Sequence, residues 1–278
     1  MQQISNSKNL NIDTTIITQP KLNKNKQLSA AILNENTKGA IYIQTPPMIP
    51  PFGVTSYDGG KGIDSDAKTW SMSLKAQGPG TEFNDDINKL FEYLKSLDEK
   101  AIDYGLLNSQ ILFKKKYDEG QRTILQDLLY NKGVKPSVGA DGTVYPDKIT
   151  CKIMKKEDMS PDLLVFKDSQ VPLEINGWDD LVNNIPKGAP LQAIIQPKIY
   201  FVNGKFGINF RLVQVKISNI QRPGRPISYA FSDLNEISTS SETSLTNVTN
   251  DKNKVVETDK KEETTYDSEG SEVDVDEA

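Results

Sequence analysis

Two neighbouring stretches near residue 200 carry side chains whose types and spacing suit binding chemistry. Residues 191–202 and 205–217 alternate apolar and polar side chains, and the intervening Asn203-Gly204 is typical of a type I′ turn in a β-hairpin. Such a turn fixes the register, so directly opposed residues have numbers that sum to 407. One face then gathers cations that neutralise anions, amides that hydrogen-bond and a flat ring that stacks, namely Gln196, Lys198, Tyr200, Lys205, Asn209 and Arg211.

The other face of this hairpin is predicted to lie in the core. Its opposed pairs are all apolar: Phe201 with Phe206, Ile199 with Ile208, Pro197 with Phe210, and Ile195 with Leu212. Gly207 lies opposite Tyr200 and leaves room for the tyrosine ring to lie flat. After Leu212 the apolar phase moves to Val213, Val215 and Ile217, which predicts a bulge or a strong bend.

The composition excludes several kinds of catalytic site. The 278 residues include no histidine and one cysteine, Cys151. Histidine bases, Ser-His-Asp triads and histidine-containing zinc sites are therefore excluded, and one cysteine forms neither a Cys₄ site nor an intramolecular disulfide. We expect a protein that is not an enzyme and has no cofactor or metal. A carboxylate metal site that follows no fixed motif is the enzyme alternative.

The charge is distributed unevenly along the chain. The formal net charge is −5, but residues 229–278 carry 14 acids and four bases, and residues 1–228 carry 24 acids and 29 bases. A basic body of charge +5 is thus joined to an acidic segment of charge −10. Such asymmetry favours a nucleic-acid or membrane partner. No stretch is apolar enough for a transmembrane helix, and the polar N-terminus lacks the apolar core of a signal peptide.

The elements that must position the hairpin can be read along the chain. Four prolines at positions 46, 47, 50 and 51 predict a rigid extended loop over 45–53. Apolar residues at three- and four-residue spacing predict a helix from Phe83 to Leu97. The remaining patterns predict strands at 28–33, 40–44, 68–74, 148–154 and 162–166, helices at 101–116, 121–130 and near Trp178, and a turn-rich connection over 133–146.

The two ends of the chain lack the regular apolar patterns of its middle. Residues 1–26 are rich in Asn, Gln, Lys and Thr and are expected to form a flexible polar arm. Residues 231–278 show no periodicity, few aromatic residues and many acids, which predicts a disordered acidic tail. One folded domain over 27–230 lies between them.

The features taken together favour single-stranded DNA as the ligand. Sequence-tolerant binding of single strands needs a positive groove for phosphates and flat rings for bases, with no catalytic residue. An acidic tail can compete for that groove, because both are polyanions, or recruit partners. A polar sheet face is also compatible with plain solvation. The alternatives are a non-enzymatic virion or scaffold protein, and an acidic-tail, chaperone-like binder of basic proteins.

Three segments carry a resemblance to a known family. Residues 45–53 (TPPMIPPFG), residues 145–152 (YPDKITCK) and the 191–217 hairpin resemble a family of nucleocytoplasmic large DNA viruses, the giant viruses, whose members look like OB-fold single-stranded DNA-binding proteins. The layout also resembles phage and bacterial single-strand binding proteins. Those usually end in an aromatic or apolar tip, whereas this chain ends Asp274-Val275-Asp276-Glu277-Ala278.

The resemblance implies a fold and a role, and the polar hairpin face with its neighbouring segments supplies the candidate contact residues. The fold would be α+β, an OB-like Greek-key barrel with helices inserted between its early and middle strands. The role would be binding of single-stranded DNA, or of RNA, in viral replication, recombination or repair, in the viral factory of the host cytoplasm or in the virion. A homo-oligomer is left open. The contact residues would be Tyr42, Phe52, Lys198, Tyr200, Lys205, Asn209, Arg211, Lys216, Arg222 and Arg225.

Overall fold

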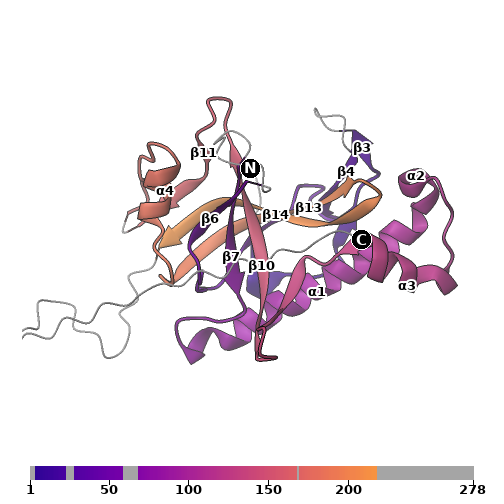
Figure 1. Cartoon of the computed structure of the whole chain (residues 1–278), viewed down its shortest axis with the longest axis horizontal. Coiled ribbons are helices and arrows are strands. Elements are labelled where there is room, and N and C mark those ends of the chain that lie inside the picture. The colour runs from indigo at the N-terminus through magenta and orange to yellow at the C-terminus, as the bar shows by residue number, and fades with distance from the viewer. Residues whose placement is uncertain (1–3, 23–27, 59–67, 168, 218–278) are drawn as a thin grey trace, which may run out of the picture. The chain divides into compact units, whose positions relative to one another are not determined.

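The computed structural model describes residues 4–22, 28–58, 68–167 and 169–217. It is an α+β fold built on one large sheet (Figure 1). The strands are β1 (Ile4–Asn6), β2 (Thr15–Ile17), β3 (Lys21–Leu22), β4 (Leu28–Asn34), β5 (Tyr42–Gln44), β6 (Val54–Tyr57), β7 (Thr69–Lys75), β8 (Tyr130–Asn131), β9 (Val134–Val138), β10 (Val144–Lys155), β11 (Pro161–Asp162), β12 (Leu164–Phe166), β13 (Leu191–Val202) and β14 (Lys205–Ile217).

In the described residues, four α-helices and several short 3-10 or π-helical segments connect these strands. The longest, α1 (Asn84–Leu107), lies between β7 and β10 in sequence, where the insertion of helices was predicted. The others are α2 (Ser109–Phe113), α3 (Arg122–Ile124), α4 (Trp178–Asn184), the 3-10 turns η1 (Ser7–Asn9), η3 (Thr81–Phe83) and η4 (Glu119–Gln121), and the π-helical η5 (Leu125–Leu129). No helix in the described ranges is both long and apolar enough to cross a membrane.

The hairpin of β13 and β14 has the predicted register. In each opposed pair from Val202/Lys205 to Ile195/Leu212, the two residue numbers add up to 407. Asn203 and Gly204 both have positive φ, as a type I′ turn requires. The register then shifts by one residue between Ile194 and Ile195, so that Ile194 lies opposite Gln214. The bulge predicted after Leu212 is therefore confirmed.

Strand pairing identifies the barrel. The main path of the sheet runs β1-β5-β13-β14-β10-β7-β6, with β10 parallel to β14 and the β13/β14, β10/β7 and β7/β6 pairs antiparallel. The Pro-rich loop joins β5, which pairs with β13, to β6, which pairs with β7. Met48 exchanges backbone hydrogen bonds with Leu191, and Ile49 N donates to Gln77 O at 3.2 Å. One segment thus bonds to both sides of the sheet and brings its two sides together in a partly open, OB-like barrel.

Helix α1 supplies much of the core. Its buried face includes Ile87, Leu90, Leu94 and Leu97, as the three- and four-residue spacing predicts. The helix approaches β14 so closely that a Cβ at Gly105 would lie 2.5 Å from the ring of Phe206. The barrel interior and α1 therefore share one apolar cluster, and the polar face of the hairpin is left on the outside.

Two segments differ from the sequence-based expectation. Residues 4–22, expected within a flexible arm, form β1, β2 and β3, and Thr15 is buried with its hydroxyl 3.0 Å from that of Tyr93. Leu10, Ile12 and Ile17 pack against the core, but they do not follow the alternation of a strand, so the sequence pattern did not reveal this segment. Residues 133–146, expected to be a turn-rich connection, contain β9, which pairs with the first half of β10. The predicted boundary near 230, the acidic tail, Arg222 and Arg225 lie outside the described residues.

Candidate nucleic-acid interface

The outer face of the hairpin carries the predicted polar set. The four core pairs named above are buried, and their neighbours along each strand point the opposite way. Lys198 and Lys205 are exposed, and Tyr200, Asn209 and Arg211 are half-buried. Gln196, expected on the same face, is 7% exposed and is therefore mostly covered. The hairpin thus presents cations around a partly exposed tyrosine ring.

This face continues onto β10 and β7. Lys152 pairs with Arg211 in the parallel ladder of β10 and β14, and Ser71 pairs with Lys152 in the antiparallel ladder of β7 and β10. Because Ile149, Cys151 and Ile153 are buried, the alternate residues of β10 point outward. The outward residues added by these two strands are Ser71, Ser73, Lys75, Lys148, Thr150 and Lys152.

Strand β14 changes neighbours along one of its edges, and this creates a hollow. β13 pairs with the whole of β14 on one side, whereas on the other side β8 pairs at Phe206 and Gly207, β10 at Phe210 and Arg211, and β12 at 214–216. Between β8 and β10 the sheet is interrupted beside Ile208 and Asn209. A hollow of about 110 Å³ lies there, which we call the lysine notch, lined by Asn131, Lys132, Gly133, Lys135, Thr150, Lys152, Tyr200, Ile208 and Asn209.

Tyr200 is fixed in the lysine notch by contacts on two sides. Its hydroxyl accepts a hydrogen bond from Asn131 Nδ2 at 3.0 Å, and Lys152 Nζ lies 5.9 Å from its ring centroid. Gly207 is required for a different reason from the one expected. A Cβ there would lie 2.4 Å from Asn131 O and 3.1 Å from the Tyr200 hydroxyl, so the absent side chain mainly admits the backbone of β8.

The electrostatics of the lysine notch favour an anion. Three lysines line it, and none of the described lining residues is a carboxylate. Partial burial and the neighbouring charge of Lys135 lower the pKa of Lys152. Both effects disfavour the unpaired ammonium, so a phosphate placed between the lysines would relieve the repulsion.

A buried carboxylate supports one wall of the notch. Asp98 on α1 accepts hydrogen bonds from the Tyr130 hydroxyl at 2.5 Å, Gly133 N at 2.8 Å and Val134 N at 3.0 Å. These bonds hold the segment that presents Asn131 and Lys132. Burial raises the pKa of Asp98 even though the hydrogen bonds oppose that change.

The remaining predicted residues are less closely grouped. Arg211 is paired with Asp162 at 2.5 Å, so its charge is already partly neutralised. Lys216 lies on β14 beyond the bulge, and Tyr42 lies on β5 with its core neighbour Ile43 pointing the other way. Phe52 is 54% exposed in the Pro-rich loop, in which Pro50 O accepts a hydrogen bond from Gly188 N.

Sequence reasoning missed three lysines of the notch as site residues: Lys132, Lys135 and Lys152. The alternation around Cys151 shows that Lys152 points away from the core, but only the pairing of β10 with β14 brings it beside Tyr200. Cys151 itself is fully buried, as expected, and burial raises the pKa of its thiol. Among the described residues, no three acidic, cysteine or histidine side chains are grouped so that they could hold a metal ion.

The class of fold is thus an OB-like barrel with a basic, tyrosine-bearing outer face. Solved structures similar to it include a single-stranded DNA-binding protein from bacteriophage Enc34 in complex with single-stranded DNA, at 12% identity and a TM-score of 0.37, covering 78% of this chain and 99% of that one. Another is gp2.5, a single-stranded DNA-binding protein encoded by bacteriophage T7, at 13% identity and a TM-score of 0.35. This match covers 63% of this chain and 90% of gp2.5. No protein-family model and no curated protein matches the sequence.

Proposed function

We propose that this protein binds single-stranded DNA with little sequence preference through the outer face of β7, β10, β14 and β13. The observation that carries the proposal is the lysine notch, in which Lys132, Lys135 and Lys152 surround Tyr200 without a carboxylate among the described lining residues. Lysines bind phosphates as point charges, and a tyrosine ring stacks on any base. The lysines and the tyrosine can therefore bind DNA of any base sequence. Lys198, Lys205 and Lys216 would extend the track along the hairpin.

The biological setting is part of the same proposal. A protein that holds single strands acts in replication, recombination or repair, and the family resemblance favours the viral factory or virion of a giant virus. The acidic segment at 231–278 would compete with DNA for the basic face or recruit partner proteins. Both roles follow from its charge of −10 beyond residue 228.

A titration with fluorescent oligo-dT at two salt concentrations tests the proposal. Affinity should fall steeply with salt, because each neutralised phosphate releases counterions. Single-stranded DNA should be preferred over a duplex of the same length in a gel shift. Absence of binding at low salt, or equal binding of single strands and duplex, contradicts the proposal.

A scaffold role is the second candidate, and one observation favours it. Leu107, Ile111 and Leu128 are 86%, 61% and 66% exposed on α1, α2 and η5. Large apolar side chains exposed on neighbouring helices are typical of a protein interface. The same gel shift separates the two candidates, because a scaffold that uses this surface requires no preference for single strands.

A further inference from the structure

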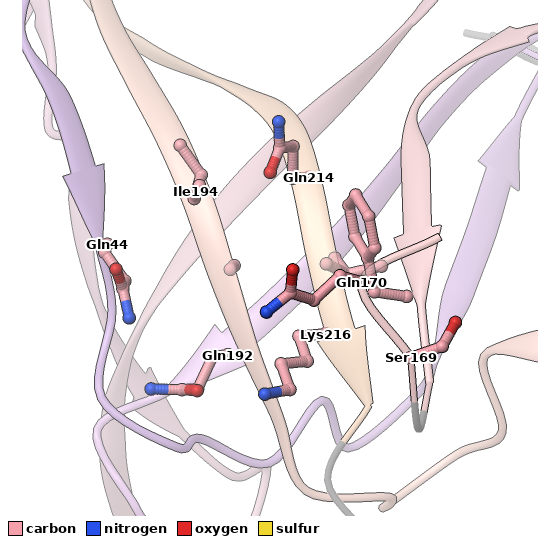
Figure 2. Close-up of a pocket in the computed structure, with 10 residues that line it drawn as sticks. Gln44, Ser169, Gln170, Gln192, Ile194, Gln214 and Lys216 are labelled. Atoms are coloured by element: carbon pink, nitrogen blue, oxygen red, sulfur yellow. The ribbon is translucent and has the colours of Figure 1, made fainter. Parts of the chain in front are cut away.

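A second hollow lies on the outer face, beyond the bulge in the hairpin. It has a volume of about 260 Å³, and four of its lining residues are glutamines, so we call it the glutamine pocket (Figure 2). Its residues come from β5, β12, β13, β14 and the loop after β12. They are Gln44, Phe166, Ser169, Gln170, Gln192, Ala193, Ile194, Gln214, Val215 and Lys216.

The bulge is what assembles this pocket. The one-residue shift places Gln214 opposite Ile194 and Lys216 opposite Gln192. On the two flanks, Gln44 of β5 lies opposite Ile194, and Phe166 of β12 pairs with Lys216. Figure 2 shows Gln170 reaching back from its loop toward β14, between Gln214 and Lys216. Four strands and one loop therefore direct side chains to one place.

The chemistry of the glutamine pocket differs from that of the lysine notch. Each glutamine amide offers two N–H donors and a carbonyl acceptor. None of the four amides hydrogen-bonds to another group in the part of the chain that the structure describes. Ile194, Val215 and the Phe166 ring supply apolar surface, and Lys216 is exposed at the pocket. The described lining has no carboxylate, so it does not suit a metal cation.

We propose that the glutamine pocket binds one unstacked base of the same DNA strand whose backbone lies in the lysine notch. This inference rests on the proposed function. The pocket is smaller than the roughly 300–1,000 Å³ of sites for drug-sized ligands, which suits a single base better than two stacked ones. Lys216 is placed to neutralise the phosphate next to that base.

The amides also explain how such a pocket accepts any base. A glutamine side chain that rotates by 180° exchanges its donor and acceptor positions, so four unpartnered amides can match the different edge patterns of the four bases. The pocket and the notch lie on one strand, since Gln214 follows Asn209 by five residues on β14. At about 3.3 Å per residue this separation is about 17 Å. A single DNA strand that runs along β14 would therefore reach both sites.

The test compares short and long oligonucleotides on the full chain. Binding of oligo-dT of 3 and 16 nucleotides is measured by anisotropy for Gln192→Leu/Gln214→Leu, for Lys152→Ala, and for the control Gln110→Leu on the exposed side of α2. Leucine keeps the volume and removes the amide. We expect the double glutamine variant to weaken the 16-mer about tenfold and leave the 3-mer unchanged, because three nucleotides are too short to occupy both sites, which lie about 17 Å apart.

The outcomes distinguish this inference from the proposed function. Lys152→Ala should weaken both lengths, and Gln110→Leu should weaken neither. If the 16-mer binds the wild type and the double glutamine variant equally, or if both lengths weaken alike, the base pocket is overturned while single-strand binding stands. If the wild type binds neither length, the proposed function itself fails.

A second readout observes the base directly. A single 2-aminopurine placed along oligo-dT fluoresces more strongly when it leaves the stack. We expect the probe to brighten when the strand binds the wild type and not when it binds Gln192→Leu/Gln214→Leu. Circular dichroism checks that the variant is folded, and equal brightening on a folded variant overturns the base pocket.

Discussion

The carboxylate of Asp98 on α1 accepts a 2.5 Å hydrogen bond from the hydroxyl of Tyr130, at the start of the segment that forms one wall of the lysine notch. The same carboxylate accepts bonds from the backbone N–H groups of Gly133 and Val134. A core helix thus holds a surface loop in place. The wall that presents Lys132 is therefore held by a residue that is itself buried.

Replacing Asp98 by alanine should destabilise the fold by about 2–4 kcal/mol, because two buried N–H groups and one hydroxyl lose their acceptor. Urea unfolding of the wild type and Asp98→Ala measures this difference. Asp98→Asn keeps one carbonyl oxygen as an acceptor and should lose less. A loss below about 0.5 kcal/mol for the alanine variant would show that these bonds contribute little.

The raised pKa of Asp98 also predicts a pH dependence. The folded state holds the proton more tightly than the unfolded state does, so this group's contribution to stability is greatest at low pH. It decreases as pH rises from the ordinary value of 3.8 through the raised one, and is constant above it. The stability of Asp98→Asn relative to the wild type should therefore improve as pH rises through that window. A difference that does not change with pH contradicts the raised pKa.

Lys152→Ala should weaken binding of oligo-dT and reduce its salt dependence. Loss of one phosphate contact lowers the slope of log affinity against log salt by about 0.7 for a single strand. Lys89→Ala, an exposed lysine on the outer side of α1, is the matched control and should leave the slope unchanged. Identical slopes for the two variants would remove Lys152 from the interface.

Tyr200→Ala should weaken single-strand binding by about 1–3 kcal/mol without unfolding the domain, because a stacking surface is lost. Tyr200→Phe keeps the ring and removes only the bond to Asn131, so it should bind almost as well as the wild type. Isothermal titration with oligo-dT separates the two. An alanine variant with an unaltered isotherm would assign Tyr200 to an ordinary solvated position.

Gly207→Ala should destabilise the barrel by about 1–3 kcal/mol, because the new methyl group meets the backbone of β8. Gly39→Ala is the control, since a Cβ there has no neighbour closer than 3.5 Å and the backbone φ is ordinary. Chemical denaturation of both variants gives the comparison. Equal stabilities would mean that β8 moves aside at no cost.

Deleting residues 233–278 should tighten binding of oligo-dT and raise the association rate, because the deletion removes ten net negative charges. Stopped-flow fluorescence at low salt measures both quantities. The difference between the truncated and full chains should shrink at high salt, since the competition is electrostatic. Weaker binding after truncation would refute competition by the acidic segment.

The hairpin was predictable from the sequence and the lysine notch was not. Asn203-Gly204 dictates the register of β13 and β14 locally, and the phase change after Leu212 marks the bulge. By contrast, the notch depends on which strand lies beside β14 at each point along it. The order of β8, β10 and β12 along β14 results from pairing between residues far apart in the sequence, so no local pattern predicts it. The pairing of β2 with β4 was missed for the same reason.

The Pro-rich loop has a consequence for how the barrel opens. Pro46, Pro47, Pro50 and Pro51 have no amide hydrogen, so the join between β5 and β6 depends on a few bonds from Thr45, Met48 and Ile49. The amide hydrogens of this join should therefore exchange with solvent sooner than those of the barrel strands. None of the described residues that line the lysine notch comes from this join, so a fluctuation that opens the join would leave that part of the proposed DNA-binding face intact.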